Sequence, residues 1–312
     1  MKYFQHTIII FLLFAISPLQ AATPPTTPKE KLKIVASFSI LGDLIRQVGK
    51  DLVDVTIIVP ENTDPHLYQP NPKDAKLLAK ADLVMTNGLG FEGWLDRLIE
   101  NSGYKGPIII ATKNVKPRSL IPDKNTQSKT ETAKDPHAWH SAPNAILYVD
   151  VIAEALKEAL PDHKYTIEKN KQFYVNQLKE LDSWIRQTYS TLPSSQRYVV
   201  TTHDAFWYYG DTYAVHFLSP VGISTDAEPA AADVAKLITE IREKKIRAVF
   251  IENLSNGKLL EEIAQEAKVT LGGTLYADSL SESPPTNTLS PATTYIDMMR
   301  YNTTEIMNAL RR

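Results

Sequence analysis

Short apolar runs alternate with amphipathic segments along most of this chain. Runs rich in β-branched and other apolar residues predict strands at 32–36, 53–59, 83–85, 107–111, 197–201, 215–218, 248–251 and 273–276. Apolar residues at helical spacing predict helices at 40–48, 71–79, 91–99, 205–213, 231–244, 259–267 and 292–310. Strands that alternate with helices in this way are typical of an α/β fold whose parallel sheets are covered by helices on both faces.

The middle of the chain reads differently, as two helices without a strand between them. Residues 144–160 form an amphipathic pattern that Pro161 interrupts, and residues 165–192 follow with no glycine or proline. A helix of that length can join two lobes as a stiff rod. We therefore expect two α/β lobes, residues 32–160 and 193–312, each with a mostly parallel sheet flanked by helices. The linking helix would occupy residues 161–192.

The N-terminus has the layout of a secretory signal peptide. Lys2 precedes an apolar run at 7–16, and small residues follow up to Ala21 and Ala22. The run is shorter than the roughly 20 apolar residues that span a bilayer. We expect cleavage after residue 21 or 22, a signal peptide at 1–22 and export into the periplasm of a Gram-negative cell. The Thr- and Pro-rich residues 23–31 predict a disordered lead-in.

Composition narrows the partners and the kinds of site. The chain contains no cysteine, so it has no disulfides and no thiolate metal site. For the same reason we expect a soluble mature protein without a lipid anchor. The formal net charge is −2 and there is no basic run, so nucleic acid is not an expected partner.

Three histidines occur in short polar motifs far apart in the chain: Asp64-Pro65-His66, Asp135-Pro136-His137 and Thr202-His203-Asp204. His66, His203 and a fourth candidate, Asp278, follow predicted strands, and ligands of open α/β sheets bind beyond the carboxyl ends of strands. Only His137 follows a long loop, residues 114–134. Imidazole and carboxylate together form a ligand set for zinc or manganese. Because two candidates lie in each half, an ion bound by all four would sit between the lobes.

Each of these histidines taken alone is more simply explained as a helix cap or a buried structural residue, and only their joint placement favours a metal. As hypotheses, Asp64, Asp135, Asp204 and Glu252 are candidates to orient the imidazole rings. His140 could be a spare ligand or an exposed loop residue, and we favour the exposed loop residue.

Four segments carry a specific resemblance that covers nearly the whole mature chain. They are Asp64-Pro65-His66-Leu67-Tyr68-Gln69-Pro70, Asp135-Pro136-His137-Ala138-Trp139, Thr202-His203-Asp204-Ala205-Phe206 and Tyr276-Ala277-Asp278-Ser279-Leu280. They resemble the ligand motifs of the zinc/manganese solute-binding proteins of bacterial ABC importers, the cluster A-I family. The resemblance implies two lobes joined by a rigid helix, with His66, His137, His203 and Asp278 as ligands. It also implies delivery of the ion to an inner-membrane permease. We expect the carrier to be a monomer.

The resemblance favours zinc and leaves manganese open. A histidine at the third ligand position, here His203, is associated with zinc in that family, and glutamate with manganese or iron. Many zinc-specific members carry a histidine-rich loop before the second motif, but residues 114–134 contain no histidine. Retention of Asp278 also resembles members that accept manganese. In general, nitrogen and oxygen sites bind zinc more tightly than manganese.

Two other classes remain as alternatives. A zinc-dependent hydrolase could use the same histidines and carboxylate with a water in a spare position. The chain has no His-Glu-x-x-His, no Gly-x-Ser-x-Gly and no phosphate-binding loop, so we expect no enzyme. A surface adhesin would need anchoring to the cell surface.

Overall fold

The computed structural model describes residues 30–119, 133–226, 228–282 and 292–312. The predicted signal peptide (1–22), nearly all of the predicted lead-in (23–31) and the middle of the predicted loop at 114–134 lie outside the described residues. Among the described helices, none is both long and apolar enough to cross a membrane.

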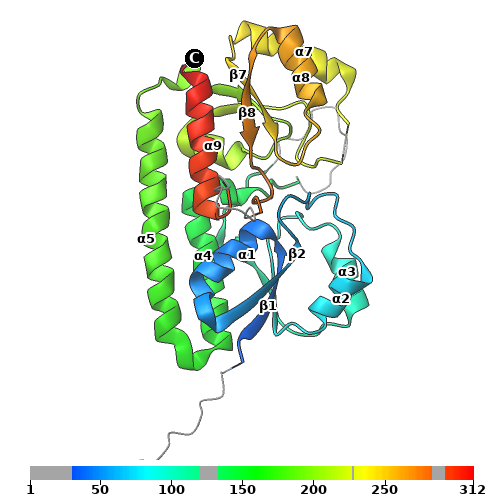
Figure 1. Ribbon diagram of the computed structural model, residues 1–312, viewed down its shortest axis with the longest axis vertical. Coiled ribbons are helices and arrows are strands. Elements are labelled where there is room, and N and C mark those ends of the chain that lie inside the picture. Colours follow the sequence, from blue (N-terminus) through cyan, green and yellow to red (C-terminus); the bar gives the residue numbers. More distant parts are fainter. Residues whose placement is uncertain (1–29, 120–132, 227, 283–291) are drawn as a thin grey trace, which may run out of the picture. The chain divides into compact units, whose positions relative to one another are not determined.

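Two four-stranded sheets, each wholly parallel, form the framework (Figure 1). The strand order is β2-β1-β3-β4 in the first sheet and β6-β5-β7-β8 in the second. The first sheet consists of β1 (Leu32–Phe38), β2 (Val53–Val59), β3 (Leu83–Thr86) and β4 (Ile108–Ile110). The second consists of β5 (Tyr198–Val200), β6 (His216–Leu218), β7 (Ala248–Glu252) and β8 (Thr270–Leu275). The predicted α/β class is confirmed.

Helices flank both sheets, and one long helix runs beside them (Figure 1). The helices are α1 (Ser39–Gly49), α2 (Pro72–Leu78), α3 (Leu95–Ser102), α4 (Ala142–Ala159), α5 (Lys164–Tyr189), α6 (Trp207–Tyr213), α7 (Ala231–Glu243), α8 (Lys258–Ala267) and α9 (Tyr295–Leu310). Figure 1 shows α5 and α9 side by side along one side of the structure, with α7 and α8 covering the opposite face of the second sheet. The lobe boundaries expected at 160/161 and 192/193 stay predictions.

Several predicted elements begin elsewhere; the helix expected at 292–310, for example, is α9 and starts at Tyr295. The helix expected at 91–99 is α3, which starts only at Leu95. Gly88, Leu89 and Gly90 have positive φ angles of 86°, 58° and 83°, which are not helical, and residues 91–94 form loop and turn before the helix. The strand expected at 273–276 is β8, which starts at Thr270, and its pairing with β7 shifts register between Val249 and Phe250. Gly272 and Gly273 interrupt the apolar residues of β8, so the hydrophobic pattern alone does not predict where this strand begins.

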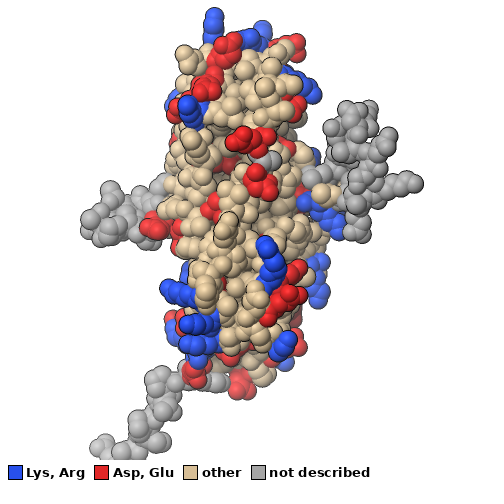
Figure 2. Space-filling model, turned by 90° about the vertical axis from the view of Figure 1, so that its right-hand side faces the viewer, with Lys and Arg blue, Asp and Glu red and all other residues tan. Residues whose placement is uncertain are grey.

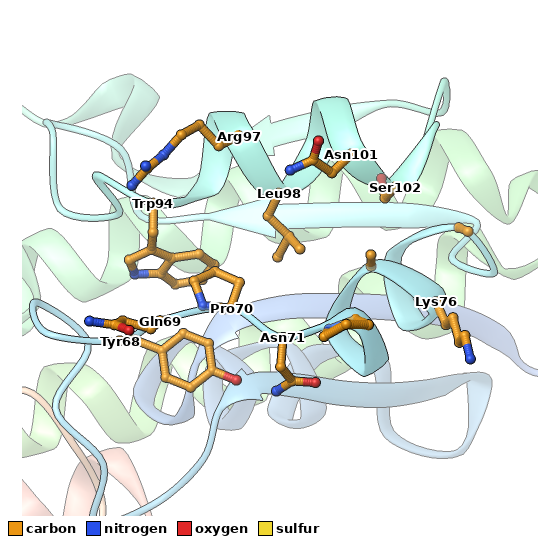
Figure 3. Close-up of a pocket in the computed structure, with 13 residues that line it drawn as sticks. Tyr68, Gln69, Pro70, Asn71, Lys76, Trp94, Arg97, Leu98, Asn101 and Ser102 are labelled. Carbon is orange, nitrogen blue, oxygen red and sulfur yellow. The ribbon is translucent and has the colours of Figure 1, made fainter.

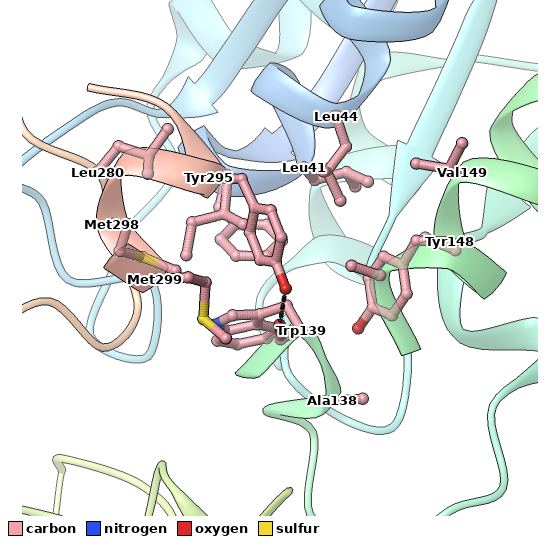
Figure 4. Close-up of a cluster of buried hydrophobic side chains, with 14 of the residues drawn as sticks. Leu41, Leu44, Ala138, Trp139, Tyr148, Val149, Leu280, Tyr295, Met298 and Met299 are labelled. Atoms are coloured by element: carbon pink, nitrogen blue, oxygen red, sulfur yellow. Dashed lines mark hydrogen bonds between the residues drawn. The ribbon is translucent and has the colours of Figure 1, made fainter. Parts of the chain in front are cut away.

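A large buried cluster joins elements of both sheets. Figure 4 shows its centre, where the ring of Tyr295 from α9 lies over Trp139, and the Tyr295 hydroxyl donates to the Trp139 carbonyl oxygen at 2.7 Å. Both side chains are fully buried. A smaller cluster lies on the other face of the second sheet, under α7 and α8. The segment that follows the predicted loop is therefore fixed by the main core, and His137 precedes Trp139 by two residues.

We predict that Gly210→Ala destabilises the protein. A Cβ at Gly210 would lie 2.5 Å from the backbone carbonyl oxygen of Val215, which cannot move aside as a side chain could. The clash should outweigh the better helix propensity of alanine and lower the free energy of unfolding by about 1–3 kcal/mol in denaturant titrations. Gly93→Ala is the control, because its Cβ would meet nothing within 4 Å. Equal stability of the Gly210 variant and the wild type would contradict this packing.

Candidate metal centre

The four predicted site residues come together at one point. One ligand atom from each of His66, His137, His203 and Asp278 lies within 4.8 Å of the others. His66 Nε2 and His137 Nε2 are 3.2 Å apart, and each is 3.5 Å from a carboxylate oxygen of Asp278. His203 Nε2 lies 3.2 Å from Asp278 Oδ2. Three ring nitrogens and a carboxylate thus face a common centre, and their side chains are only 0–6% exposed.

His66 is held by its own turn. The Asp64 carboxylate accepts a hydrogen bond from the His66 backbone N–H at 2.8 Å, and Trp94 Nε1 donates to the Pro65 carbonyl oxygen at 2.9 Å. The ring itself lies edge-on to Phe91, with centroids 4.9 Å apart. The backbone of this turn is therefore tied both to Asp64 and to the start of α3.

His137 is oriented by a buried carboxylate. Asp135 Oδ1 lies 2.9 Å from His137 Nδ1 and also accepts from the His137 backbone N–H at 3.0 Å. Asn87, beyond the end of β3, donates to the Pro136 carbonyl oxygen at 2.9 Å and accepts from the Tyr148 hydroxyl at 2.5 Å. With the Nδ1 proton directed at Asp135, the Nε2 lone pair of His137 is left for a cation.

His203 has the same arrangement in the second sheet. Glu252, the last residue of β7, lies with Oε2 2.5 Å from His203 Nδ1. Its other oxygen accepts from the backbone N–H groups of Thr202 at 2.9 Å and His203 at 3.1 Å. The geometry therefore agrees with two hypotheses: that Asp135 orients the ring of His137, and that Glu252 orients the ring of His203.

Asp278 is positioned by residues that the sequence pattern did not single out. Asn302 of α9 accepts from the Tyr276 backbone N–H at 3.0 Å and donates to the Tyr276 carbonyl oxygen at 2.7 Å. Trp139 Nε1 donates to the Ala277 carbonyl oxygen at 3.0 Å, and Ser39 Oγ accepts from the Leu280 backbone N–H at 3.0 Å. The only sequence signal for Asn302 is a lone amide on an otherwise apolar helix face.

The other candidate residues have different partners. Asp64 binds backbone N–H groups and the Thr225 hydroxyl, and Asp204 accepts a hydrogen bond from Ser219, so neither carboxylate contacts a ligand ring. His140 is fully buried, and the prediction of an exposed loop residue is wrong. Its ring packs against Phe206 with centroids 4.4 Å apart, and burial lowers its pKa to about 3. His140 is thus a neutral core histidine beside the site.

Charge coupling dominates the electrostatics of the centre. Burial lowers the pKa of His203, but the negative charges of Glu252 and Asp278 outweigh burial and hold that pKa well above its usual value. Burial raises the pKa of Asp278, and the charges of His203 and His137 outweigh it, so the pKa of Asp278 stays well below its usual value. The metal-free centre therefore binds a proton on His203 where a cation would otherwise sit.

Comparison with known proteins identifies the family. The family described as ZnuA, "Zinc-uptake complex component A periplasmic", matches residues 34–309. The chain belongs to this family. The resemblance inferred from the four motifs is thereby confirmed, and the protein is a periplasmic metal-binding component of a metal uptake system.

The relatives and solved structures that this chain resembles are named after different metals. The manganese-binding lipoprotein MntA of Halalkalibacterium halodurans is 31% identical over 98% of both chains. The iron-binding protein YfeA of Yersinia pestis is 30% identical and covers 94% of this chain and 91% of its own. The periplasmic zinc binding protein TroA of Treponema pallidum is 27% identical, with a TM-score of 0.80 over 91% of this chain and all of its own. A manganese-bound periplasmic metal binding protein of Candidatus Liberibacter asiaticus is 29% identical, with a TM-score of 0.78 over 90% of this chain and all of its own.

The prediction of a protein without a lipid anchor is wrong. The Halalkalibacterium relative and the Bacillus subtilis MntA, which is 32% identical over 97% of both chains, are both named lipoproteins. The prediction rested only on the absence of cysteine from the sequence. The absence of one residue type does not by itself decide how a protein is held at a membrane.

We predict that Glu252→Gln weakens metal binding. The substitution keeps the shape of the side chain but removes the negative charge that orients His203 and favours its interaction with a cation. We expect a loss of about 10–100-fold in affinity, the usual effect of removing a carboxylate behind a ligating histidine. Isothermal titration calorimetry with zinc measures it, and Glu261→Gln, on the exposed side of α8, is the control. Unchanged affinity would contradict the orienting role.

We also predict that metal binding releases a proton from His203. Because the folded-state pKa of His203 is raised, its contribution to the stability of the metal-free protein is complete below the unfolded value of about 6.5 and is lost as pH rises through the folded value. Metal affinity should therefore increase with pH over this range. Calorimetry in buffers of different ionisation enthalpy measures the released protons. Glu252→Gln should release fewer at pH 7.5, and equal release would contradict the assignment.

Proposed function

We propose that His66, His137, His203 and Asp278 together bind the divalent metal ion that this protein carries. The observation behind this proposal is the convergence of four ligand atoms within 4.8 Å of one another, from motifs spread over the whole chain. A tetrahedral site with metal–ligand distances of about 2.0–2.1 Å requires neighbouring ligand atoms about 3.3–3.4 Å apart. The 3.2 Å between the ring nitrogens of His66 and His137, and the 3.2–3.5 Å from each ring nitrogen to one or the other oxygen of Asp278, are close to that spacing.

We propose zinc as the ion that binds most tightly, with manganese as the second candidate. Three imidazoles and one carboxylate suit zinc, and nitrogen-rich sites bind zinc more tightly than manganese. Both oxygens of Asp278 face the ring nitrogens, so the carboxylate can also offer the additional oxygen that manganese favours. The manganese names of several relatives support this second candidate.

The protein would deliver its ion to an ABC-type permease in the inner membrane and act as a monomer. Relatives named as substrate-binding components of metal ABC transporters support the permease as the partner. We propose lobes at 32–160 and 193–312 joined by the helix at 161–192. His66 and His137 come from the first lobe, and His203 and Asp278 from the second, so a small separation of the lobes would weaken the site and release the ion.

A transport role also explains the burial of the four side chains better than a catalytic role does. The four side chains are only 0–6% exposed, whereas a catalytic zinc keeps a position open for water and substrate. We therefore propose that the protein is not an enzyme.

Alanine variants test the ligand set. Replacing His66, His137 or His203 by alanine removes one of four bonds to the ion and should lower zinc affinity by at least about 100-fold, which is about 2.7 kcal/mol. Calorimetry measures the affinity, and circular dichroism should show an unchanged metal-free fold. His216→Ala is the matched control, since His216 lies in β6 and stacks on Tyr198 outside the site. Normal affinity in all three variants would end the assignment.

Metal analysis tests the identity of the ion. Protein purified without added metal should contain zinc, and zinc should displace manganese in competition titrations because of its stronger binding to nitrogen ligands. Manganese that resists displacement by an equal concentration of zinc would reverse the preference. Binding of neither ion would remove the proposed function.

A further inference from the structure

One side of the centre is closed by the main core. The ring of His137 lies 5.2 Å from that of Trp139 and 5.9 Å from that of Phe91, centroid to centroid. Phe38 packs behind both, with centroids 5.0 and 4.9 Å away. These residues are at most 2% exposed. An ion could not leave on this side without opening the hydrophobic core.

The other side faces a cavity of about 700 Å³, and two of the four ligands, His203 and Asp278, line it. Its lining includes four carboxylates, those of Asp64, Glu228, Glu252 and Asp278, and none of the described residues that line it is a lysine or arginine. Glu228 is exposed, so the cavity reaches the surface. On the face shown in Figure 2, acidic side chains lie near the middle of the structure. Such a lining attracts cations and disfavours anions.

The second large cavity lacks these properties. It has a volume of about 830 Å³ and lies between α2 and α3. Figure 3 shows Trp94, Tyr68 and Arg97 at one end of it and Lys76 at the other end. None of the four ligands lines it, and its charged lining is basic. Of these two large cavities, the acidic one is therefore the more suitable approach for a cation.

A single loop spans the acidic cavity and contacts the turns of two ligands. We call residues 219–225, between β6 and α7, the strap. At one end, Val221 forms a parallel bridge with His203, and the Gly222 carbonyl oxygen accepts from the Asp204 backbone N–H at 3.1 Å. At the other end, the Thr225 hydroxyl donates to Asp64 Oδ2 at 2.7 Å. Thr225 and Asp64 are 161 residues apart in the chain.

The Asp64 carboxylate links Thr225 to the turn of His66. One oxygen of its carboxylate accepts from Thr225, and the other accepts from the His66 backbone N–H at 2.8 Å. The strap is therefore one hydrogen bond from the turn of His66 and directly paired with the turn of His203. Movement of the strap would change the separation of these two ligands and open the cavity at the same time.

We propose that Thr225 is a positioning residue of the metal centre and that the ion enters and leaves through the acidic cavity beneath the strap. The hydrogen bond from Thr225 to Asp64 keeps the strap closed over the bound ion. This inference rests on the proposed function, because it assumes that His66 and His203 hold the ion.

Thr225→Val tests the strap, since it keeps the size of the side chain and removes the hydroxyl. Zinc dissociation, measured by transfer to an excess of a chromogenic chelator in stopped flow, should become about tenfold faster or more, the effect expected on losing a hydrogen bond to a charged group. Thr225→Ser should restore the slow rate. The thermal unfolding midpoint of the metal-free protein should stay within a few degrees of wild type. Thr239→Val is the control, since its hydroxyl donates only to the backbone of α7.

Unchanged dissociation in Thr225→Val would overturn the role of Thr225. Faster dissociation that Thr225→Ser does not restore would also overturn it, because the hydroxyl would then not be the cause. If the wild type itself failed to bind zinc or manganese, the proposed function would fail instead, and that result would be visible before any variant was compared.

Glu228→Lys tests the route. Reversing this charge should slow zinc association several-fold at low ionic strength, and the difference should shrink as salt screens the charge. Glu158→Lys is the control, an equal charge change at an exposed position near the end of α4. Equal association rates for the two variants would overturn the proposed route and would leave the ligand assignment intact.

Discussion

The arrangement depends on one constraint: three imidazoles and a carboxylate must be held, buried, around a point where a cation fits. Burial of such groups is unfavourable unless each has a partner. The structure meets this by placing a second polar layer behind the ligands. Asp135 and Glu252 bind the far ring nitrogens of His137 and His203, and Asn302 clamps the backbone that leads to Asp278. The four proposed ligand atoms are therefore held in place without a metal.

The two parallel sheets place most of these side chains. Both are parallel, so the carboxyl ends of their strands lie at one edge of each sheet, and the turns after β2 and β5 deliver His66 and His203 from those edges. Glu252 ends β7 beside β5, which places it behind His203. His137 comes instead from a segment fixed by the core around Trp139 and Tyr295. The metal centre thus joins two sheet edges to the main core.

Rigid ligands alone would make a poor carrier, because the ion must also be given up. The core side of the centre is fixed by packed aromatic rings, whereas the acidic cavity is spanned by the strap, which contacts the turns of His66 and His203 through hydrogen bonds. In the proposed function, a site that is firm on one side and closed by separable contacts on the other holds an ion tightly and releases it when the proposed lobes separate. This difference between the two sides underlies the role proposed for Thr225.

The sequence by itself determined the alternation of strands and helices, the α/β class and the four residues that meet at the centre. These follow from local periodicity and from short motifs, which act over a few residues. Only the tertiary structure decided that His140 is buried, that Asn302 positions Asp278 and that Thr225 reaches Asp64. Their partners lie far away in the chain, and a single polar residue has no period. Such contacts exist only once the elements have packed, because packing alone selects which distant groups meet.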